Sequence, residues 1–171
     1  MLIFTHTFSW TRTVLMAVAM MLVTGQVLAA NTSGPAPDFT LKSRSGENIK
    51  LSELRGQVVM INFWASWCGP CRQEMPILDQ LYQRYEPMGF TLLGVNVEED
   101  SAAAEKVLRE IPVSFPVLYD SKNQVSENYQ VRAMPSTFLI DRDGKVRYLH
   151  KGYKPGYEDE YQQQVRELIR E

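Results

Sequence analysis

The fold is constrained most by a continuous apolar strand that is followed at once by the start of a helix. The strand is Val58-Val-Met-Ile-Asn-Phe-Trp64, whose only polar residue is Asn62. A strand on a sheet surface alternates apolar and polar residues, so this run predicts a central strand covered on both faces. From Pro70 to about Tyr85, apolar residues recur at three- and four-residue spacing, which predicts an amphipathic helix. We therefore expect a layered fold built around this strand and helix.

Strand and helix patterns alternate along the rest of the chain. Two short strands near Phe39 and Asn48 flank a Ser-Gly turn and predict a hairpin. A second buried strand is predicted at 90–97, and Asp143-Gly144 marks a later hairpin. The other predicted elements are helices at 101–110, 123–129 and near the C-terminus, and strands at 116–119, 137–141 and 146–149. This order predicts an α/β sandwich in which helices flank a central mixed β-sheet.

The sequence predicts one globular domain behind an export signal. A chain of 171 residues, 44% of them apolar, can bury one core but is short for two. Residues 1–29 combine one charge, Arg12, with an apolar run and small residues at the −3 and −1 positions of a cleavage site after Ala29, a pattern typical of a cleavable signal peptide. Residues 30–37 are predicted to be a linker and residues 38–171 the folded domain. The alternative for the first segment is an uncleaved membrane anchor, although its apolar run is shorter than the roughly 20 residues of a spanning helix.

The charge composition argues against a nucleic-acid partner. The chain has 18 basic and 20 acidic residues, a formal net charge of −2, and the two signs are interspersed. Binding to phosphates requires a basic stripe or patch, and the sequence contains none.

Two cysteines, Cys68 and Cys71, are the only ones in the chain, and they stand where the buried strand ends and the helix begins. Unpaired amides and the helix dipole favour an anion there, so the Cys68 thiol should ionise below its reference pKa of about 8.5. We expect Cys68 to be an exposed nucleophile. Cys71 follows one helical turn later, points inward and is expected to resolve the mixed disulfide. Such a redox-active disulfide carries the electrons itself and needs no cofactor.

Three other interpretations of the cysteine pair remain open at this point. A zinc site needs four ligands, and the chain has no further cysteines and only two histidines, His6 and His150. A purely structural disulfide would close a loop so short that the entropic gain is small. A Cu(I) site could use both thiols with Met134, since soft sulfur ligands suit Cu(I).

A Met134-Pro135 pair precedes the strand predicted at 137–141. An X-Pro bond at the entrance to a strand is a candidate cis peptide, although such bonds are more often trans. With Trp-Cys-Gly-Pro-Cys upstream, we expect this bond to be cis.

Two segments, Phe63–Cys71 and Met134–Asp141, together resemble the thioredoxin superfamily, and more closely its exported TlpA/ResA branch. The similarity extends from Pro37 to the C-terminus. Cys71-Arg-Gln-Glu-Met-Pro76 is similar to the active-site helix of this branch. The resemblance implies a thioredoxin-like sandwich with an N-terminal β-hairpin. The long interval between Cys71 and Pro135 matches the central helix-strand insertion of the branch.

The resemblance also assigns a role to an acidic residue. Plain thioredoxins bury an aspartate six positions before the first cysteine, where this chain has Asn62. The TlpA/ResA branch instead has a glutamate three residues after the second cysteine, which is Glu74 here. One helical turn places Glu74 on the face of Cys71, so it could relay a proton to or from that thiol. The alternative is a glutamate that only complements the helix dipole.

Five residues are candidates for substrate binding around Cys68. Members of the superfamily pair an extended substrate strand with backbone groups beside the cis proline. Several of the candidates are expected to form an apolar rim around the nucleophile. The candidate residues are Trp67, Gly69, Pro70, Met134 and Pro135.

The resemblance implies a thiol-disulfide oxidoreductase of the periplasm that acts as a reductant. Expected substrates are exported proteins with cysteine pairs, such as apocytochrome c or the copper-site cysteines of oxidases. A membrane electron donor of the DsbD or CcdA type would recharge the enzyme, which we expect to be a monomer. The alternatives are a thiol peroxidase-like antioxidant protein, which shares this fold, and a Cu(I)-handling protein for oxidase assembly.

Overall fold

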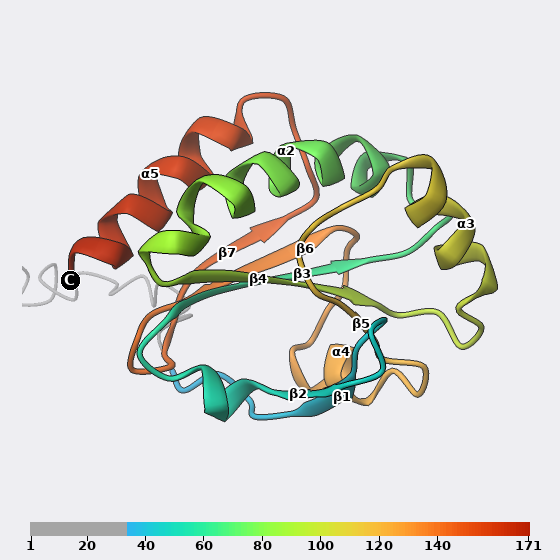
Figure 1. The fold of residues 1–171 in the computed structure, drawn as a ribbon, viewed down its shortest axis with the longest axis horizontal. Coiled ribbons are helices and arrows are strands. Elements are labelled where there is room, and N and C mark those ends of the chain that lie inside the picture. The colour runs from blue at the N-terminus through green and yellow to red at the C-terminus, as the bar shows by residue number, and fades with distance from the viewer. Residues whose placement is uncertain (1–33) are drawn as a thin grey trace, which may run out of the picture. The chain divides into compact units, whose positions relative to one another are not determined.

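The computed structural model describes residues 34–171, so the predicted signal peptide lies outside the described residues. A five-stranded sheet has the strand order β5-β4-β3-β6-β7, and β1 and β2 form a separate hairpin (Figure 1). The strands are β1 (Thr40–Lys42), β2 (Asn48–Lys50), β3 (Val58–Trp64), β4 (Phe90–Asn96), β5 (Val117–Tyr119), β6 (Ser136–Ile140) and β7 (Val146–Lys151). The α-helices are α2 (Gly69–Tyr85), α3 (Ala102–Glu110), α4 (Gln124–Asn128) and α5 (Tyr157–Arg170), with short 3-10 turns η1 (Leu51–Leu54) and η2 (Glu86–Met88).

The sheet is mixed, as the sequence predicts. Strand β3 pairs in parallel with β4, which pairs in parallel with β5 at the edge of the sheet. On its other side β3 pairs antiparallel with β6, which continues through a hairpin into β7. The predicted central helix and strand are α3 and β5, which follow β4 in the chain. The α/β sandwich with an N-terminal hairpin is confirmed.

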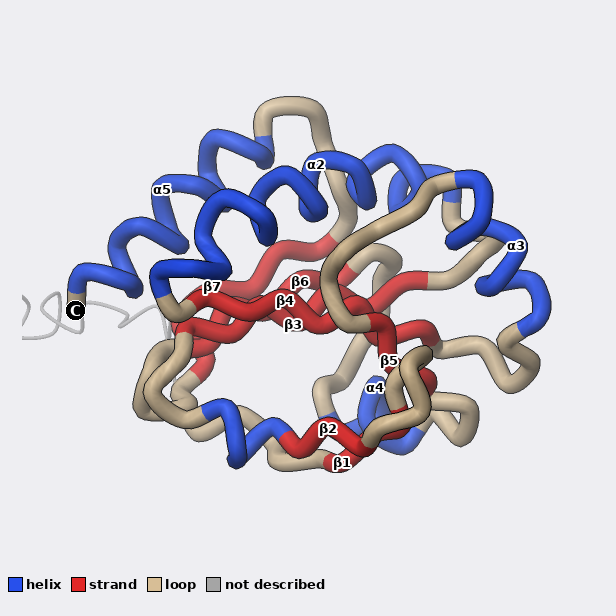
Figure 2. The backbone as a smooth tube through the Cα atoms, viewed as in Figure 1, coloured by secondary structure: helices blue, strands red, loops and turns tan. Residues whose placement is uncertain are grey.

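Strand β3 is buried along its whole length because a layer covers each face of the sheet. Met60 and Trp64 belong to a core cluster that includes apolar residues of α2, α3 and α5. Ile61 and Phe63 alternate with them and pack into a second cluster, which includes residues of the hairpin and α4. Figure 2 shows the same layers, with α2, α3 and α5 above the sheet and the hairpin and α4 below it.

Helix α2 begins directly at the cysteine motif and covers the central strands. Its N-cap is Cys68, and Pro70 occupies the first turn, where a missing amide leaves no helical hydrogen bond unmade. Pro76 lies within the helix, as the sequence indicates. One face of the helix is buried, and it consists of Cys71, Glu74, Met75, Leu78, Leu81 and Tyr85.

The end of the predicted linker packs against the domain. The amide of Ala36 donates to the carbonyl of Gly144 at 2.9 Å, and the amide of Val146 donates to the carbonyl of Gly34 at 2.9 Å. Ala36 is also buried in the second core cluster. Residues 34–37 therefore contribute to the fold through their backbone, despite a composition typical of a linker. Within residues 34–171, no helix has the length and apolar character needed to cross a membrane.

Substitution of Gly94 should test the packing of the layer above β4. A Cβ atom at Gly94 would lie 2.7 Å from the ring of Phe115, which is buried in the core. We expect Gly94→Ala to lower the free energy of unfolding by about 1–3 kcal/mol, because the ring must shift within a packed core. Gly69→Ala is the matched control, since a Cβ there meets nothing within 4 Å. Equal stability of the two variants in urea unfolding would contradict this packing argument.

Candidate active site

Cys68 and Cys71 form a disulfide at the junction of β3 and α2. Their sulfur atoms are 2.04 Å apart and their Cα atoms 5.3 Å apart. The amide of Cys71 donates to the sulfur of Cys68 at 3.2 Å, so Cys68 caps the helix with its side chain. An amide and a helix dipole directed at this sulfur favour its thiolate when the bond is reduced.

Cys68 is the less buried of the two cysteines, but it is less exposed than the sequence predicts. The exposed fraction of Cys68 is 4%, against 1% for Cys71. The expectation of an exposed Cys68 is therefore wrong for this oxidised state, because its sulfur is bonded to that of buried Cys71. Cys68 nevertheless lines an open groove of about 640 Å³, whereas Cys71 does not. The inward position of Cys71 is confirmed.

The groove beside Cys68 is formed by the two segments that the sequence singled out. Most of the candidate substrate-binding residues line it, and Trp67 is 71% exposed. The Met134-Pro135 bond is cis, as expected. Pro135 itself is buried and does not line the groove, and its carbonyl accepts the amide of Gly152 at 2.7 Å within the fold. The lining residues are Trp67, Cys68, Gly69, Pro70, Val131, Arg132, Ala133 and Met134.

Glu74 is completely buried, at 0% exposure, on the buried face of α2 that also carries Cys71. The amide of Asn62 donates to one carboxyl oxygen at 2.9 Å, and the hydroxyl of Tyr161 donates to the other at 2.7 Å. Asn62 also donates to the hydroxyl of Thr137 at 2.9 Å. Both oxygens of the carboxyl group thus have a donor, which a buried polar group needs.

The alternation of side chains along the strands explains why these polar groups meet. Asn62 lies between Met60 and Trp64 on the face of β3 that packs under α2. Thr137 is its direct partner on β6, and His150 is the partner of Thr137 on β7. Side chains of directly paired residues point to the same face of a sheet, so the three form a polar row across it. Glu74 and Tyr161 come from the two helices above that row.

Burial raises the pKa of Glu74 to about 7, and the hydrogen bonds from Tyr161 and Asn62 only partly oppose this shift. Near neutral pH the carboxyl group is therefore divided between its charged and neutral forms. A group with this property can both accept and release a proton at that pH.

Two partners of Glu74 were not identified from the sequence. Tyr161 is predicted only as a member of the buried face of the last helix, and Asn62 only as the position of a missing acid. The signal in the sequence that points to a contact of Tyr161 is that a buried tyrosine hydroxyl usually finds a polar partner. The sequence does not show which partner, because that depends on how α5 lies beside α2.

The chain matches the AhpC/TSA family over residues 32–149. It is 40% identical over 124 residues to the thiol-disulfide oxidoreductase ResA of Geobacillus kaustophilus, an overlap of 72% of this chain and 71% of that protein. The chain belongs to the ResA-like thiol-disulfide oxidoreductases of the AhpC/TSA family. The predicted family and enzyme class are thereby confirmed.

Solved structures agree with this assignment. A crystal structure from Chlorobium tepidum, assigned as thiol:disulfide interchange protein DsbE, has a TM-score of 0.77 and 41% identity, covering 80% of this chain and 96% of that one. A solution structure from Bacteroides thetaiotaomicron, assigned as a protein disulfide isomerase, has a TM-score of 0.74 and 31% identity, covering 80% and 89%.

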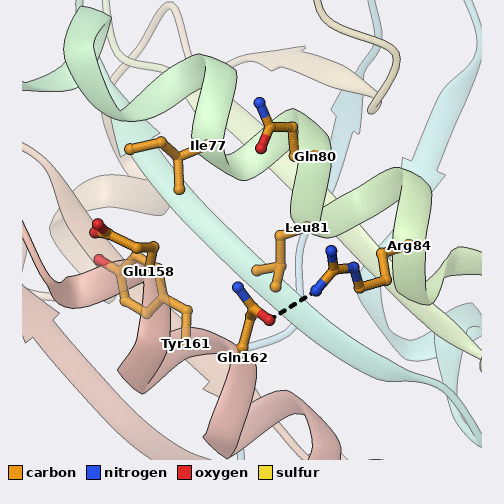
Figure 3. A pocket seen from close by; sticks show the side chains of 7 residues that line it. All are labelled: Ile77, Gln80, Leu81, Arg84, Glu158, Tyr161 and Gln162. Carbon is orange, nitrogen blue, oxygen red and sulfur yellow. Dashed lines mark hydrogen bonds between the residues drawn. The ribbon is translucent and has the colours of Figure 1, made fainter.

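A more enclosed pocket of about 240 Å³ lies between α2 and α5 of the oxidoreductase, and neither cysteine lines it. Arg84 and Gln162 form a hydrogen bond of 2.9 Å in it, drawn as a dashed line in Figure 3. Tyr161 links this pocket to the active site, because its hydroxyl donates to Glu74. The lining residues are Ile77, Gln80, Leu81, Arg84, Glu158, Tyr161 and Gln162. Among residues 34–171, no group of three or more His, Cys, Asp or Glu side chains is arranged to hold a metal ion.

The raised pKa of Glu74 predicts a specific pH dependence of stability in the oxidised oxidoreductase. The folded protein holds this proton more tightly than the unfolded chain, whose glutamate has a pKa of 4.5. The contribution of Glu74 to the stability should therefore be greatest below pH 4.5 and be lost as pH rises through about 7. The loss should be on the order of 3 kcal/mol relative to Glu74→Gln, measured by urea unfolding across this range. Parallel pH profiles of the two proteins would contradict the shift.

Removal of the Tyr161 hydroxyl should raise the pKa of Glu74 further. This hydrogen bond lowers the pKa of Glu74, whereas burial raises it, so in Tyr161→Phe a larger part of the upward shift remains. The pH at which stability is lost should then move upward in the same unfolding measurement. Tyr157→Phe on the same helix is the control, because within residues 34–171 its hydroxyl makes no hydrogen bond to Glu74. An unchanged or lowered transition pH in Tyr161→Phe would count against the contact.

Proposed function

We propose that this oxidoreductase is exported to the periplasm, where it reduces disulfides in other exported proteins. The observation that carries the exchange reaction is Glu74, a completely buried carboxyl group with a pKa near 7 on the helix face of the resolving Cys71. Export is proposed from the signal-peptide pattern of residues 1–29. A resolving thiol must lose its proton before it can attack a mixed disulfide. A buried acid that changes protonation state near neutral pH is suited to accept that proton.

The exchange begins when the Cys68 thiolate attacks one sulfur of a substrate disulfide. The substrate S–S bond breaks, a mixed disulfide forms, and the second substrate sulfur leaves as a thiolate that takes up a proton. Cys71 then gives its proton to the Glu74 carboxylate and attacks the sulfur of Cys68. The first substrate sulfur leaves and is protonated in turn. Two electrons have passed to the substrate, and the enzyme holds the Cys68–Cys71 disulfide seen in the structure.

The groove beside Cys68 supports an extended segment of a protein as the substrate. In residues 34–171, neither the amide nor the carbonyl of Met134 takes part in a backbone hydrogen bond. Free backbone groups at the wall of a groove can pair with an added strand. The exposed ring of Trp67 lines the same groove and offers apolar contact area. We assign substrate binding to these two residues together with Gly69 and Pro70.

A reductant in an oxidising compartment must be recharged after each cycle. The proposal therefore includes a membrane electron donor of the DsbD or CcdA type that reduces the Cys68–Cys71 disulfide. The proposed substrates are exported proteins with cysteine pairs, such as apocytochrome c or the copper-site cysteines of oxidases. The names of the relatives support the exchange reaction, and the Gly-Pro pair between the cysteines resembles that of reducing members of the superfamily.

Trapping with Cys71→Ser tests this function. Without the resolving thiol, mixed disulfides through Cys68 should accumulate with a small set of envelope proteins, identified after non-reducing electrophoresis. A Cys68→Ser, Cys71→Ser double variant is the control and should trap none. Absence of adducts in Cys71→Ser would contradict the proposal. Peroxide consumption by that variant would instead favour a thiol peroxidase, and stoichiometric Cu(I) binding by the reduced wild type would favour a copper-handling protein.

The reduction potential tests the direction of transfer. A reductant should have a reduction potential of about −270 mV, whereas a reduction potential of about −120 mV would make the protein an oxidant.

A further inference from the structure

Glu98 is an acidic residue outside the reaction described above that is bonded to the active-site loop. It follows the end of β4, and its carboxylate accepts two hydrogen bonds from Ser66, which lies just before the cysteine motif. The amide of Ser66 donates at 2.7 Å and its hydroxyl at 2.6 Å. Both donors of Ser66 are thus bound by one carboxylate, from the segment that follows β4.

Ser66 is part of the turn that leads into the nucleophile. The amide of Cys68 donates to the carbonyl of Ala65 at 3.1 Å, which closes a turn with Ser66 and Trp67 at its centre. The amide of Ser66 has no role in that closing bond and remains free to bind Glu98. The turn also places Trp67 on the wall of the groove. The position of the turn therefore fixes both the nucleophile and part of the groove.

Glu98 is itself held in place by its neighbour on β4. The side-chain amide of Asn96 donates to the Glu98 carboxylate at 2.9 Å, and the Glu98 backbone amide donates back to Asn96 at 3.1 Å. Burial acts to raise the pKa of Glu98, but the hydrogen bonds from Asn96 and Ser66 outweigh it and lower the pKa. Asp100 opposes this lowering. The carboxylate is therefore charged at neutral pH.

We propose that Glu98 is a positioning residue that fixes the Ala65–Cys68 turn and places a negative charge near Cys68, which keeps the couple more reducing. The proposal concerns the exchange reaction itself, so it does not depend on the cellular direction or substrates proposed above.

Distance supports an effect of this charge on the nucleophile. Two steps of about 3.8 Å along the chain separate the Cα atoms of Ser66 and Cys68, so the carboxylate lies within about 12 Å of Cys68. That is comparable to the screening length of about 8–10 Å at moderate salt, and a partly buried path is screened less. A negative charge here offsets the helix N-terminus that favours the Cys68 thiolate. Arg132, on the wall of the groove, is a charge of opposite sign.

Two substitutions separate the charge of Glu98 from its hydrogen bonds. In Glu98→Gln, the amide oxygen can still accept from Ser66 and Asn96, while the amide nitrogen can donate to the Ser66 hydroxyl. This variant keeps the turn and loses the charge. Glu98→Ala loses both. Glu99→Gln is the matched control, because Glu99 is the exposed neighbour and does not hold Ser66.

The test measures the equilibrium of each protein with glutathione and its rate of reaction, when reduced, with oxidised glutathione. Glu98→Gln should shift the equilibrium roughly three- to tenfold toward the reduced protein, with its rate within about twofold of wild type. Glu98→Ala should show the same shift and a rate lower by about tenfold or more, because the nucleophile is less well positioned. Glu99→Gln should leave the equilibrium and the rate unchanged.

Two results would overturn the proposal. An unshifted glutathione equilibrium in Glu98→Gln would refute the role of the charge. An unchanged rate in folded Glu98→Ala would refute the positioning. If Glu98→Ala does not fold, Ser66→Ala removes only the hydroxyl contact and should still slow the reaction. A purely structural Glu98 would lower stability in urea without moving the equilibrium of the Gln variant.

Discussion

The structure depends on the burial of β3 between two apolar layers. Six of the seven side chains of this strand are apolar, and all seven are buried, so the strand can only exist with helices on one face and the hairpin layer on the other. Its end is then fixed in space, and helix α2 must start there to cover it. The disulfide lies at that junction, and the packing of the core determines where its helix N-terminus points.

The same burial creates the unusual acid of the site. Asn62 is the polar residue of β3, and the pleat directs it toward the helix layer, where Glu74 lies without access to water. A carboxyl group in that position is more easily kept neutral, and the two donors that satisfy it only partly restore its charge. A fold that excludes water thus supplies a group that titrates near neutral pH.

The elements of the fold could be predicted because hydrophobic periodicity is local. The run at β3, the spacing along α2 and the turn before β7 are each visible within a few residues. The contacts of Glu74 could not be predicted, since Tyr161 reaches it only through the packing of α5 beside α2. The low exposure of Cys68 is that of the disulfide-bonded protein, and the sequence does not encode which oxidation state the structure shows. Gly and Pro content suggested a linker at 30–37, but composition does not show that backbone groups of residues 34–37 are paired.

The backbone hydrogen bonds of Gly34 and Ala36 also determine at which end of the sheet the chain enters the domain. Ala36 donates to Gly144 in the turn between β6 and β7, and Gly34 accepts from Val146, the first residue of β7. Strand β6 runs antiparallel to β3, with Ile140 beside Val59 and Ser136 beside Phe63, so this turn lies at the opposite end of the sheet from Cys68. The chain thus enters the domain at one pole and presents its sulfur chemistry at the other. A fusion partner or tether joined before Gly34 would be attached at the end of the sheet opposite the groove. It would therefore leave the approach of other proteins to Cys68 open.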